Sequence, residues 1–260
     1  ALGHPTPPAY AHLPLILRPD RAKLSKRHGA VAVEDFRSRG ILPEALLNYL
    51  ALLGWAPDDG REVMTRDEIT EAFELERVTH SAAVFDEKKL EWLNAEWIRR
   101  LPLDDLAGRV GARLREQDGS VRIDEELLRA ATELGQERAK TLVELAEQME
   151  FLFVDDADFE IAQDSWEIVS NTERGDEVLA AARAHLESSE WSFEACNLIP
   201  VVRALDLKPK LVMPLLYAAI EGRRAGLPLW RDGAFGSISL LGRERTLARL
   251  ADARARLEQS

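Results

Sequence analysis

Two lysines that lie three residues apart, Lys23 and Lys26, enclose Leu24 and Ser25 and follow a short apolar segment. At this spacing both ammonium groups could reach one set of phosphate oxygens. When a nucleotide is transferred to a carboxylate, negative charge builds up on the leaving pyrophosphate. A cation that engages this charge mainly in the transition state can lower the barrier by roughly 3 kcal/mol. Taken alone, however, a heptapeptide rich in Lys and Arg is more often solvated surface than a phosphate site.

Apolar periodicity predicts a mainly α chain around this loop. Four prolines before residue 18 leave room for one short strand, at residues 13–17. Pro43 begins a helix that Gly54 ends, Thr65 and Glu68 form a capping box, and another helix runs from Asp86 toward a domain boundary near residue 102. Further helices are predicted at residues 103–116, 124–134, 138–151, 175–188, 193–205, 208–223 and 239–257.

Composition places the chain among globular proteins, since 46% of its residues are hydrophobic, and its length of 260 residues suffices for two domains. No apolar run is long enough to span a bilayer. The single cysteine, Cys196, and the absence of zinc spacing indicate neither an internal disulfide nor a structural metal site. We therefore expect no metal ligands and no membrane association.

The net charge of -12 argues at first against nucleic-acid binding. The charge is unevenly distributed, however. Residues 147–194 carry fourteen carboxylates and only two arginines. In contrast, residues 18–39 carry seven cations and three carboxylates, and residues 203–258 carry eleven cations and six carboxylates. Two basic regions thus flank an acidic one, and this distribution weakens the objection to a nucleic-acid partner.

The loop and its surroundings resemble bacterial glutamyl-tRNA synthetases. Lys23 to Gly29 (KLSKRHG) is similar to the KMSKS loop of that family, with Leu24 in place of Met and Arg27 in place of the final Ser. The resemblance continues through LPEALLNYL at 42–50, LGW at 53–55, the pairs FD at 85–86 and KL at 89–90, WLN at 92–94, and LGRER at 241–245. It spans nearly the entire chain.

The resemblance implies that Lys23 and Lys26 are catalytic. ATP phosphates would be held by Lys23, Leu24, Ser25, Lys26 and Arg27, with Lys26 as the main contact and magnesium accompanying ATP. The family's HIGH motif has no match, because none of the five histidines begins such a tetrad. We therefore expect that the sequence begins inside a longer enzyme and that this chain alone does not aminoacylate.

Four residues are candidate tRNA contacts: Tyr217, Arg223, Arg224 and Trp230. Tyr217 is chosen by the same resemblance, Arg223 and Arg224 because they form a dense basic spot, and Trp230 because, beside Arg231, it is the tryptophan expected to be exposed. Tyr217 stands at or beside the place of an arginine that reads an anticodon base in the family. An aromatic ring there could stack on a base, which is worth about 1 to 3 kcal/mol. It could equally be a core residue, and we favour the core.

The predicted organisation has four parts: the end of a catalytic domain with the loop (1–40), a helical unit that contacts the tRNA stem (41–102), and two helical anticodon-binding subdomains (103–190 and 191–260). The predicted function is the tRNA-binding C-terminal portion of a cytoplasmic, monomeric glutamate–tRNA ligase. Its predicted partners are ATP, glutamate and glutamate tRNA, with glutamine tRNA as a second candidate.

Two alternatives stay open. Glutaminyl-tRNA synthetase shares the loop chemistry but carries β-barrel anticodon domains, so strands after residue 103 would favour it. A non-catalytic helical scaffold that binds proteins through its acidic face would show no affinity for tRNA at low salt.

Overall fold

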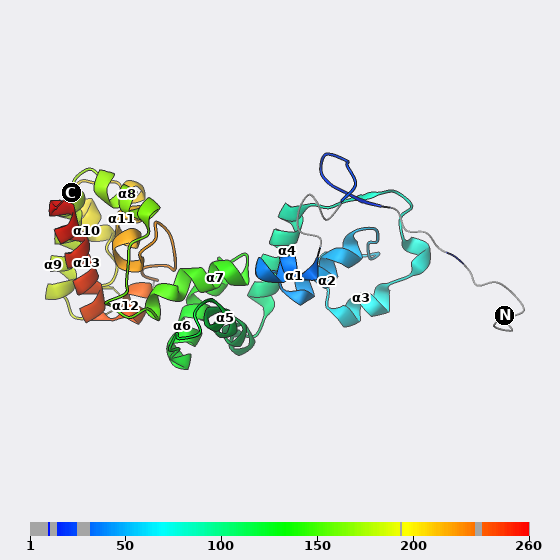
Figure 1. The fold of residues 1–260 in the computed structure, drawn as a ribbon, viewed down its shortest axis with the longest axis horizontal. Helices are drawn as coiled ribbons and strands as arrows, with labels where there is room; N and C mark the ends of the chain where they lie inside the picture. The colour runs from blue at the N-terminus through cyan, green and yellow to red at the C-terminus, as the bar shows by residue number, and fades with distance from the viewer. Residues whose placement is uncertain (1–9, 11–14, 25–31, 193, 232–235, 260) are drawn as a thin grey trace, which may run out of the picture. The chain divides into compact units, whose positions relative to one another are not determined.

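The computed structural model describes residues 10, 15–24, 32–192, 194–231 and 236–259. The chain forms two compact units, residues 1–100 and 101–260, drawn in blue to cyan and in green to red in Figure 1. Among the described residues, no helix is both long enough and apolar enough to cross a membrane. Each unit is described by itself below.

Unit 1 is a small helical unit with one pair of short strands. Its helices include those predicted after Pro43, Thr65 and Asp86, and the predicted capping box is present: Thr65 Oγ1 accepts the Glu68 N–H at 3.2 Å, and Glu68 Oε2 accepts the Thr65 N–H at 2.7 Å. The elements are β1 (Ile16–Leu17), α1 (Val33–Ser38), α2 (Pro43–Leu52), α3 (Arg66–Ala72), the 3-10 helix η1 (Leu75–Arg77), β2 (Ala83–Val84) and α4 (Glu87–Arg100).

The core of unit 1 lies between α2 and α4 and contains two fully buried amides. Asn48 Oδ1 accepts hydrogen bonds from the Met64 N–H at 2.9 Å and from Trp97 Nε1 at 3.1 Å. Asn94 Oδ1 accepts the N–H of Leu42, the residue before α2, at 2.7 Å. Because a buried N–H without a partner is costly, the two amides fix how α2 packs on α4.

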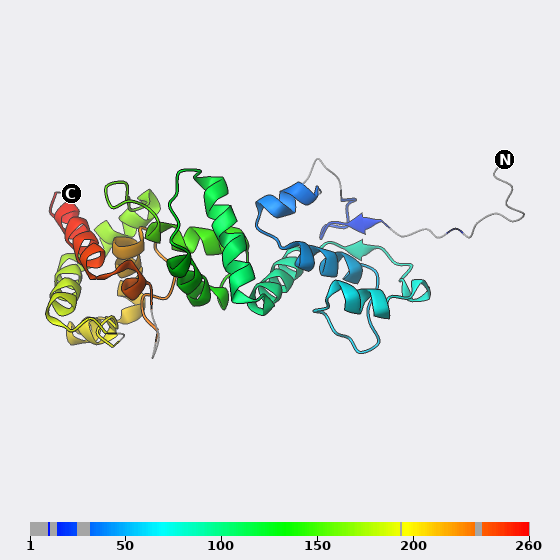
Figure 2. The same cartoon turned by 90° about the horizontal axis from the view of Figure 1, so that it is seen from below.

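The described part of unit 2 consists of helices and the segments that connect them, and it contains no β-strand. This finding removes the β-barrel alternative and confirms the mainly α fold. Figure 2 shows its helices from a second direction. They are α5 (Leu103–Gln117), α6 (Glu125–Gln136), α7 (Leu142–Met149) with the 3-10 helix η2 (Glu150–Leu152), α8 (Gln163–Asn171), α9 (Gly175–Ser188), α10 (Ile199–Ala204), α11 (Pro209–Glu221), α12 (Ser237–Leu241) and α13 (Arg243–Glu258).

Three predicted helices of unit 2 had wrong limits. The helix expected at 138–151 begins at Leu142, because Thr141 Oγ1 caps it by accepting the Glu144 N–H at 3.0 Å. The helix expected at 193–205 begins only at Ile199, whose N–H donates to Asn197 Oδ1 at 3.0 Å. The helix expected at 239–257 is two helices, since Gly242 adopts a φ of +88° that no α-helix contains.

Candidate functional site

A tight turn after β1 determines where the predicted phosphate loop begins. The Arg18 N–H donates to the Ala22 carbonyl at 2.8 Å, and Arg21 takes a left-handed φ of 63°. Asp20 Oδ1 accepts the Ala22 N–H at 3.0 Å, and this hydrogen bond, helped by the Arg18 guanidinium, lowers the pKa of Asp20. The chain therefore reverses within a few residues and returns antiparallel to β1.

Lys23 is the first residue of the returning chain. It forms an antiparallel bridge with Leu17, and its side chain is exposed. Leu24 is half-buried, and its N–H donates to the Ile16 carbonyl at 3.1 Å. The other predicted ATP contacts, Ser25, Lys26 and Arg27, lie outside the described residues.

The described residues on both sides of the loop contact the same segment of unit 1. On the entry side, β1 pairs in parallel with β2, and the N–H of Phe85, directly after β2, donates to the Leu17 carbonyl at 2.8 Å. On the exit side, α1 buries Phe36, whose ring centroid lies 5.8 Å from that of Phe85. Phe85 in turn contacts Tyr49 of α2 edge-on at 5.1 Å. Packed elements thus fix both anchors of the loop, as a positioned catalytic group requires.

In unit 2 the structure brings two of the four predicted tRNA contacts, Tyr217 and Trp230, close together in the chain's fold. Tyr217 lies on α11 and is half-buried; its hydroxyl oxygen accepts hydrogen bonds from the Leu229 N–H and from the Arg138 guanidinium. Burial, with a smaller contribution from Glu221, raises the pKa of Tyr217. The phenol therefore joins the residue before Trp230 to an arginine at the end of α6.

A surface cavity of about 340 Å³ opens beside these residues. One wall comes from the C-terminal end of α6 and the other from the segment that leads to α12. Its polar groups are two guanidiniums, Arg138 and Arg231, one carboxylate, Glu137, and the indole of Trp230. The cavity is lined by Leu134, Glu137, Arg138, Pro228, Trp230 and Arg231.

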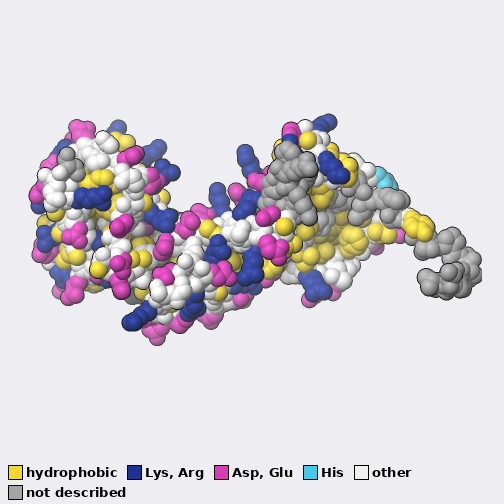
Figure 3. All heavy atoms as spheres, viewed as in Figure 1, with side chains coloured by type: hydrophobic (Ala, Val, Ile, Leu, Met, Phe, Trp, Pro, Cys, Tyr) yellow, Lys and Arg dark blue, Asp and Glu magenta, His cyan; other side chains and the backbone are white. Residues whose placement is uncertain are grey.

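The two remaining candidates lie elsewhere. Arg223 is engaged by carboxylates, since its guanidinium lies 3.0 Å from Glu150 and 3.9 Å from Glu147. The backbone N–H of Arg224 donates to Ser165 Oγ at 3.0 Å, and its side chain lines a separate cavity beside α8 and α11. Figure 3 shows why net charge is a poor guide here: cationic and acidic side chains are interspersed over the visible face of unit 2.

Arg138 and Glu137 were missed by the sequence analysis. Both fall at the start of the helix predicted at 138–151 or next to it, and nothing in their spacing distinguishes them from other surface charges. Arg231 was noticed only as the neighbour of Trp230. The convergence of these residues depends on the contact between α6 and the segment before α12, which is almost one hundred residues away in sequence.

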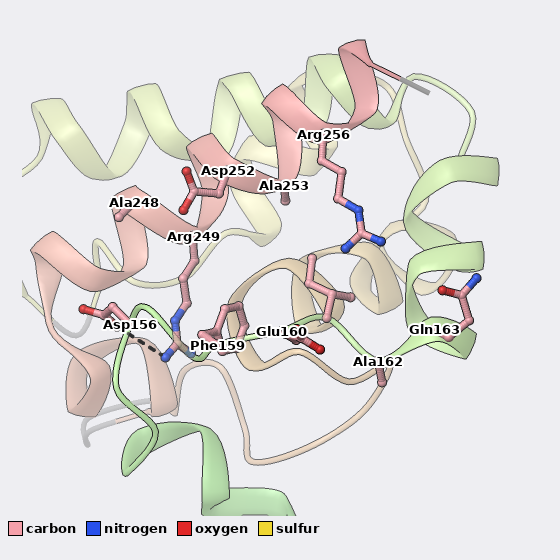
Figure 4. Close-up of a pocket in the computed structure, with 11 residues that line it drawn as sticks. Asp156, Phe159, Glu160, Ala162, Gln163, Ala248, Arg249, Asp252, Ala253 and Arg256 are labelled. Atoms are coloured by element: carbon pink, nitrogen blue, oxygen red, sulfur yellow. Dashed lines mark ion pairs between the residues drawn. The ribbon is translucent and has the colours of Figure 1, made fainter.

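A larger cavity, of about 460 Å³, lies between α13 and residues 156–163 (Figure 4). Two arginines of α13 point toward it, but both are occupied: Arg249 lies 3.6 Å from the ring centroid of Phe159, and Arg256 lies 3.9 Å from that of Trp166. Three carboxylates, Asp156, Glu160 and Asp252, also line it. This charge pattern does not favour an anionic ligand such as phosphate.

Comparison with known proteins gives consistent results over the whole chain. Residues 1–92 match the model of the class I tRNA synthetase (E and Q) catalytic domain, and residues 90–254 match that of an anticodon binding domain. A glutamate–tRNA ligase of Dehalococcoides mccartyi (strain 195) is 40% identical over all of this chain and 53% of its own length. That of Acidothermus cellulolyticus is 41% identical over 98% of this chain and 51% of its own length.

A solved structure shows the same fold. The glutamate tRNA ligase of Elizabethkingia meningosepticum, crystallised in complex with its amino acid, superimposes with a TM-score of 0.72 at 23% identity. The match covers 96% of this chain and 52% of that one. The chain therefore spans about half the length of the relatives it matches.

Proposed function

Because this chain belongs to the glutamate–tRNA ligases, a family of class I aminoacyl-tRNA synthetases, we propose that it supplies the phosphate loop and the tRNA-binding region of such an enzyme. The complete enzyme would activate glutamate with ATP and transfer it to the 3′ end of glutamate tRNA. The observation that carries the first part is the anchoring of residues on both sides of the loop at Phe85.

In the activation step, a carboxylate oxygen of glutamate would attack the α-phosphorus of ATP, and pyrophosphate would leave with the bonding electrons. Lys26, with Lys23 assisting, would stabilise the charge that grows on pyrophosphate. Ser25 would shape the loop, while Leu24 and Arg27 complete the phosphate contacts. Magnesium would accompany ATP on its phosphates. Among the described residues, no group of three or more His, Cys, Asp or Glu is placed to hold a metal ion.

The loop assignment is tested by Lys26→Ala in the enzyme that contains this chain. The expected loss in ATP–pyrophosphate exchange is about 100-fold, which corresponds to roughly 3 kcal/mol of transition-state stabilisation. Affinity for tRNA should change little. Lys88→Ala removes an exposed lysine from α4 and serves as the matched control. Unchanged exchange in Lys26→Ala would show that the assigned role is wrong.

For tRNA, we propose that the cavity beside Trp230 takes an unpaired base of the anticodon loop. An indole offers a stacking surface, guanidiniums stack or donate hydrogen bonds, and a carboxylate accepts an exocyclic amine. Arg231 and Glu137 line the cavity together with Arg138, whose guanidinium also donates to Tyr217. A volume of about 340 Å³ lies at the small end of ligand pockets and suits a single nucleotide. Tyr217 would support Arg138 from behind.

Binding of a glutamate tRNA transcript to this chain, measured by filter binding at several salt concentrations, tests the tRNA part. Affinity should fall as salt rises, because phosphate contacts release counter-ions. Trp230→Ala should weaken binding by about 1 to 3 kcal/mol, whereas Arg122→Ala, at an exposed arginine between α5 and α6, should not. No binding at low salt would support the protein-binding scaffold instead.

Three finer properties remain predictions: use of glutamine tRNA as a second substrate, a monomeric state and a cytoplasmic location. The first is tested by the same filter-binding measurement with a glutamine tRNA transcript. Equal affinities for the two transcripts would support the broader substrate range.

A further inference from the structure

Glu221 is the last residue of α11, and its side-chain carboxyl group is buried inside unit 2. Burial raises its pKa well above the usual range, which Ser237, the Leu227 N–H and Arg249 only partly offset. Burying a carboxyl group is costly unless hydrogen bonds or a charged partner offset the lost hydration. Neither the phosphate loop nor the base cavity uses it directly.

The contacts of Glu221 join the end of α11 to two positions that follow it in the chain, Gly226 and Ser237. Ser237 Oγ, at the first residue of α12, donates a hydrogen bond to Glu221 Oε1. The other oxygen, Oε2, faces Gly226: a methyl group on Gly226 would lie 1.9 Å from it. The carboxyl group therefore fills the space between the end of α11, the start of α12 and the segment that leaves α11.

Ser237 passes this restraint on to the wall of the base cavity. Its own N–H donates to the Pro228 carbonyl at 2.8 Å, and the N–H of Ile238 donates to the Leu229 carbonyl at 3.2 Å. Pro228 lines the cavity, and Leu229 lies between it and Trp230. One residue thus contacts both the buried carboxyl group and the backbone that carries Trp230.

We propose that Glu221 is a positioning residue for tRNA binding: through Ser237 it fixes residues 228–231, which form one wall of the base cavity. The inference rests on the proposed function, because it concerns the same cavity. Glu221 itself does not touch the RNA. Its effect on affinity comes from holding Trp230 and Arg231 opposite Arg138.

The test compares three variants of the chain in filter binding with a glutamate tRNA transcript. Glu221→Ala and Ser237→Ala each remove the hydrogen bond, and each should raise the Kd roughly tenfold, as expected when one buried hydrogen bond no longer holds a contact surface. Glu221→Gln keeps an oxygen that accepts from Ser237, so its Kd should stay within about twofold of the wild type. This rescue separates positioning from the charge of the carboxyl group.

A general loss of stability has to be distinguished from loss of position. Val178→Ala truncates a fully buried residue of α9 and should lower the melting temperature without changing the Kd. Gly226→Ala, which pushes on the carboxyl group without removing it, should weaken tRNA binding as Ser237→Ala does. Amide hydrogen exchange should accelerate at Ser237 and Ile238, whose N–H groups donate to the Pro228 and Leu229 carbonyls, in Glu221→Ala and not in Val178→Ala.

The outcomes discriminate between the two proposals. Wild-type binding with unchanged binding by Glu221→Ala would overturn the positioning role and leave the proposed function intact. Weakened binding by Glu221→Gln equal to that of Glu221→Ala would also overturn it, because the hydrogen bond would then be irrelevant. Absence of wild-type binding would overturn the proposed function and, with it, the role of Glu221.

Discussion

The two units fix their internal segments with buried polar side chains of different kinds. Unit 1 uses the neutral amides Asn48 and Asn94, whereas unit 2 uses the ionisable Glu221 and Arg249. An amide needs only hydrogen-bond partners, but a buried ion also loses its hydration. The comparison therefore implies that the amide contacts of unit 1 are insensitive to pH, while the stability of unit 2 depends on the charge states and contacts of its buried carboxyl and guanidinium groups.

Arg249→Met should produce the largest effect and would test the charged half of this comparison. The Arg249 side chain is 3% exposed and donates to two carbonyls, Ile220 at 2.7 Å and Phe151 at 3.0 Å. Burial lowers its pKa to about 10, so it remains charged at neutral pH. Met fills similar space but leaves both carbonyls without their donor and Glu221 without the nearby positive charge. We expect a loss of about 3 to 5 kcal/mol in the free energy of unfolding of unit 2.

The free energy of unfolding is measured in urea, and the unfolding is monitored by amide hydrogen exchange in α11 and α13. Arg254→Met is the matched control, because Arg254 lies on the same helix but pairs with Asp176 at the surface. Exposed pairs contribute little, so this variant should unfold like the wild type. If Arg249→Met and Arg254→Met behave alike, the buried arginine is not what holds the end of α11.

Most helices of both units were predictable from local signals. The capping box at Thr65 and Glu68 and Pro43 at the first turn of α2 are properties of a few neighbouring residues, and the corresponding helices were found. α1 and α8 were missed, since no hydrogen bond from an N-cap side chain marks either start, and so was the two-residue strand β2. β2 exists because it pairs with β1, which lies more than sixty residues earlier.

Asn94→Ala tests the neutral half of the comparison and should have a smaller effect. The substitution leaves the Leu42 N–H buried without its acceptor, which we expect to cost about 2 kcal/mol. The loss should be the same at pH 5 and pH 8, because no charge is involved. Lys88→Ala, at an exposed position of α4, is the control. A loss that varied with pH would contradict the assignment of unit 1 as the insensitive one.

The candidate sites, like the helices, could be predicted where neighbouring residues carry the signal and could not where distant segments must meet. Lys23 to Arg27 could be recognised because the residues are contiguous, so the motif carries its own signal. The base cavity could not, because Arg138 and Trp230 meet only after α6 packs beside the segment before α12. For the same reason, nothing in the sequence marked Glu221 as a buried group.

Glu221→Gln should have the smallest effect on the free energy of unfolding, and the direction in which this effect changes with pH is informative. Because the pKa of Glu221 is raised in the folded protein, its carboxyl group keeps its proton at pH values where the same group in the unfolded chain, with a pKa near 4.5, has lost it. The stability that the protonated carboxyl group contributes is thus complete below pH 4.5 and is lost as pH rises toward the folded-state pKa. Gln does not titrate, so the variant should lack this decline.

At pH 4 the variant should differ from the wild type by less than about 1 kcal/mol, because its amide oxygen still accepts from Ser237. As pH rises, unfolding curves should show the variant gaining relative to the wild type. Arg249 on α13 limits this gain, since its positive charge favours the ionised carboxyl, and Tyr217 on α11 would feel the same charge. Parallel stability curves between pH 4 and 8 would mean that Glu221 is as neutral in effect as Asn94, and the contrast between the two units would then rest on Arg249 alone.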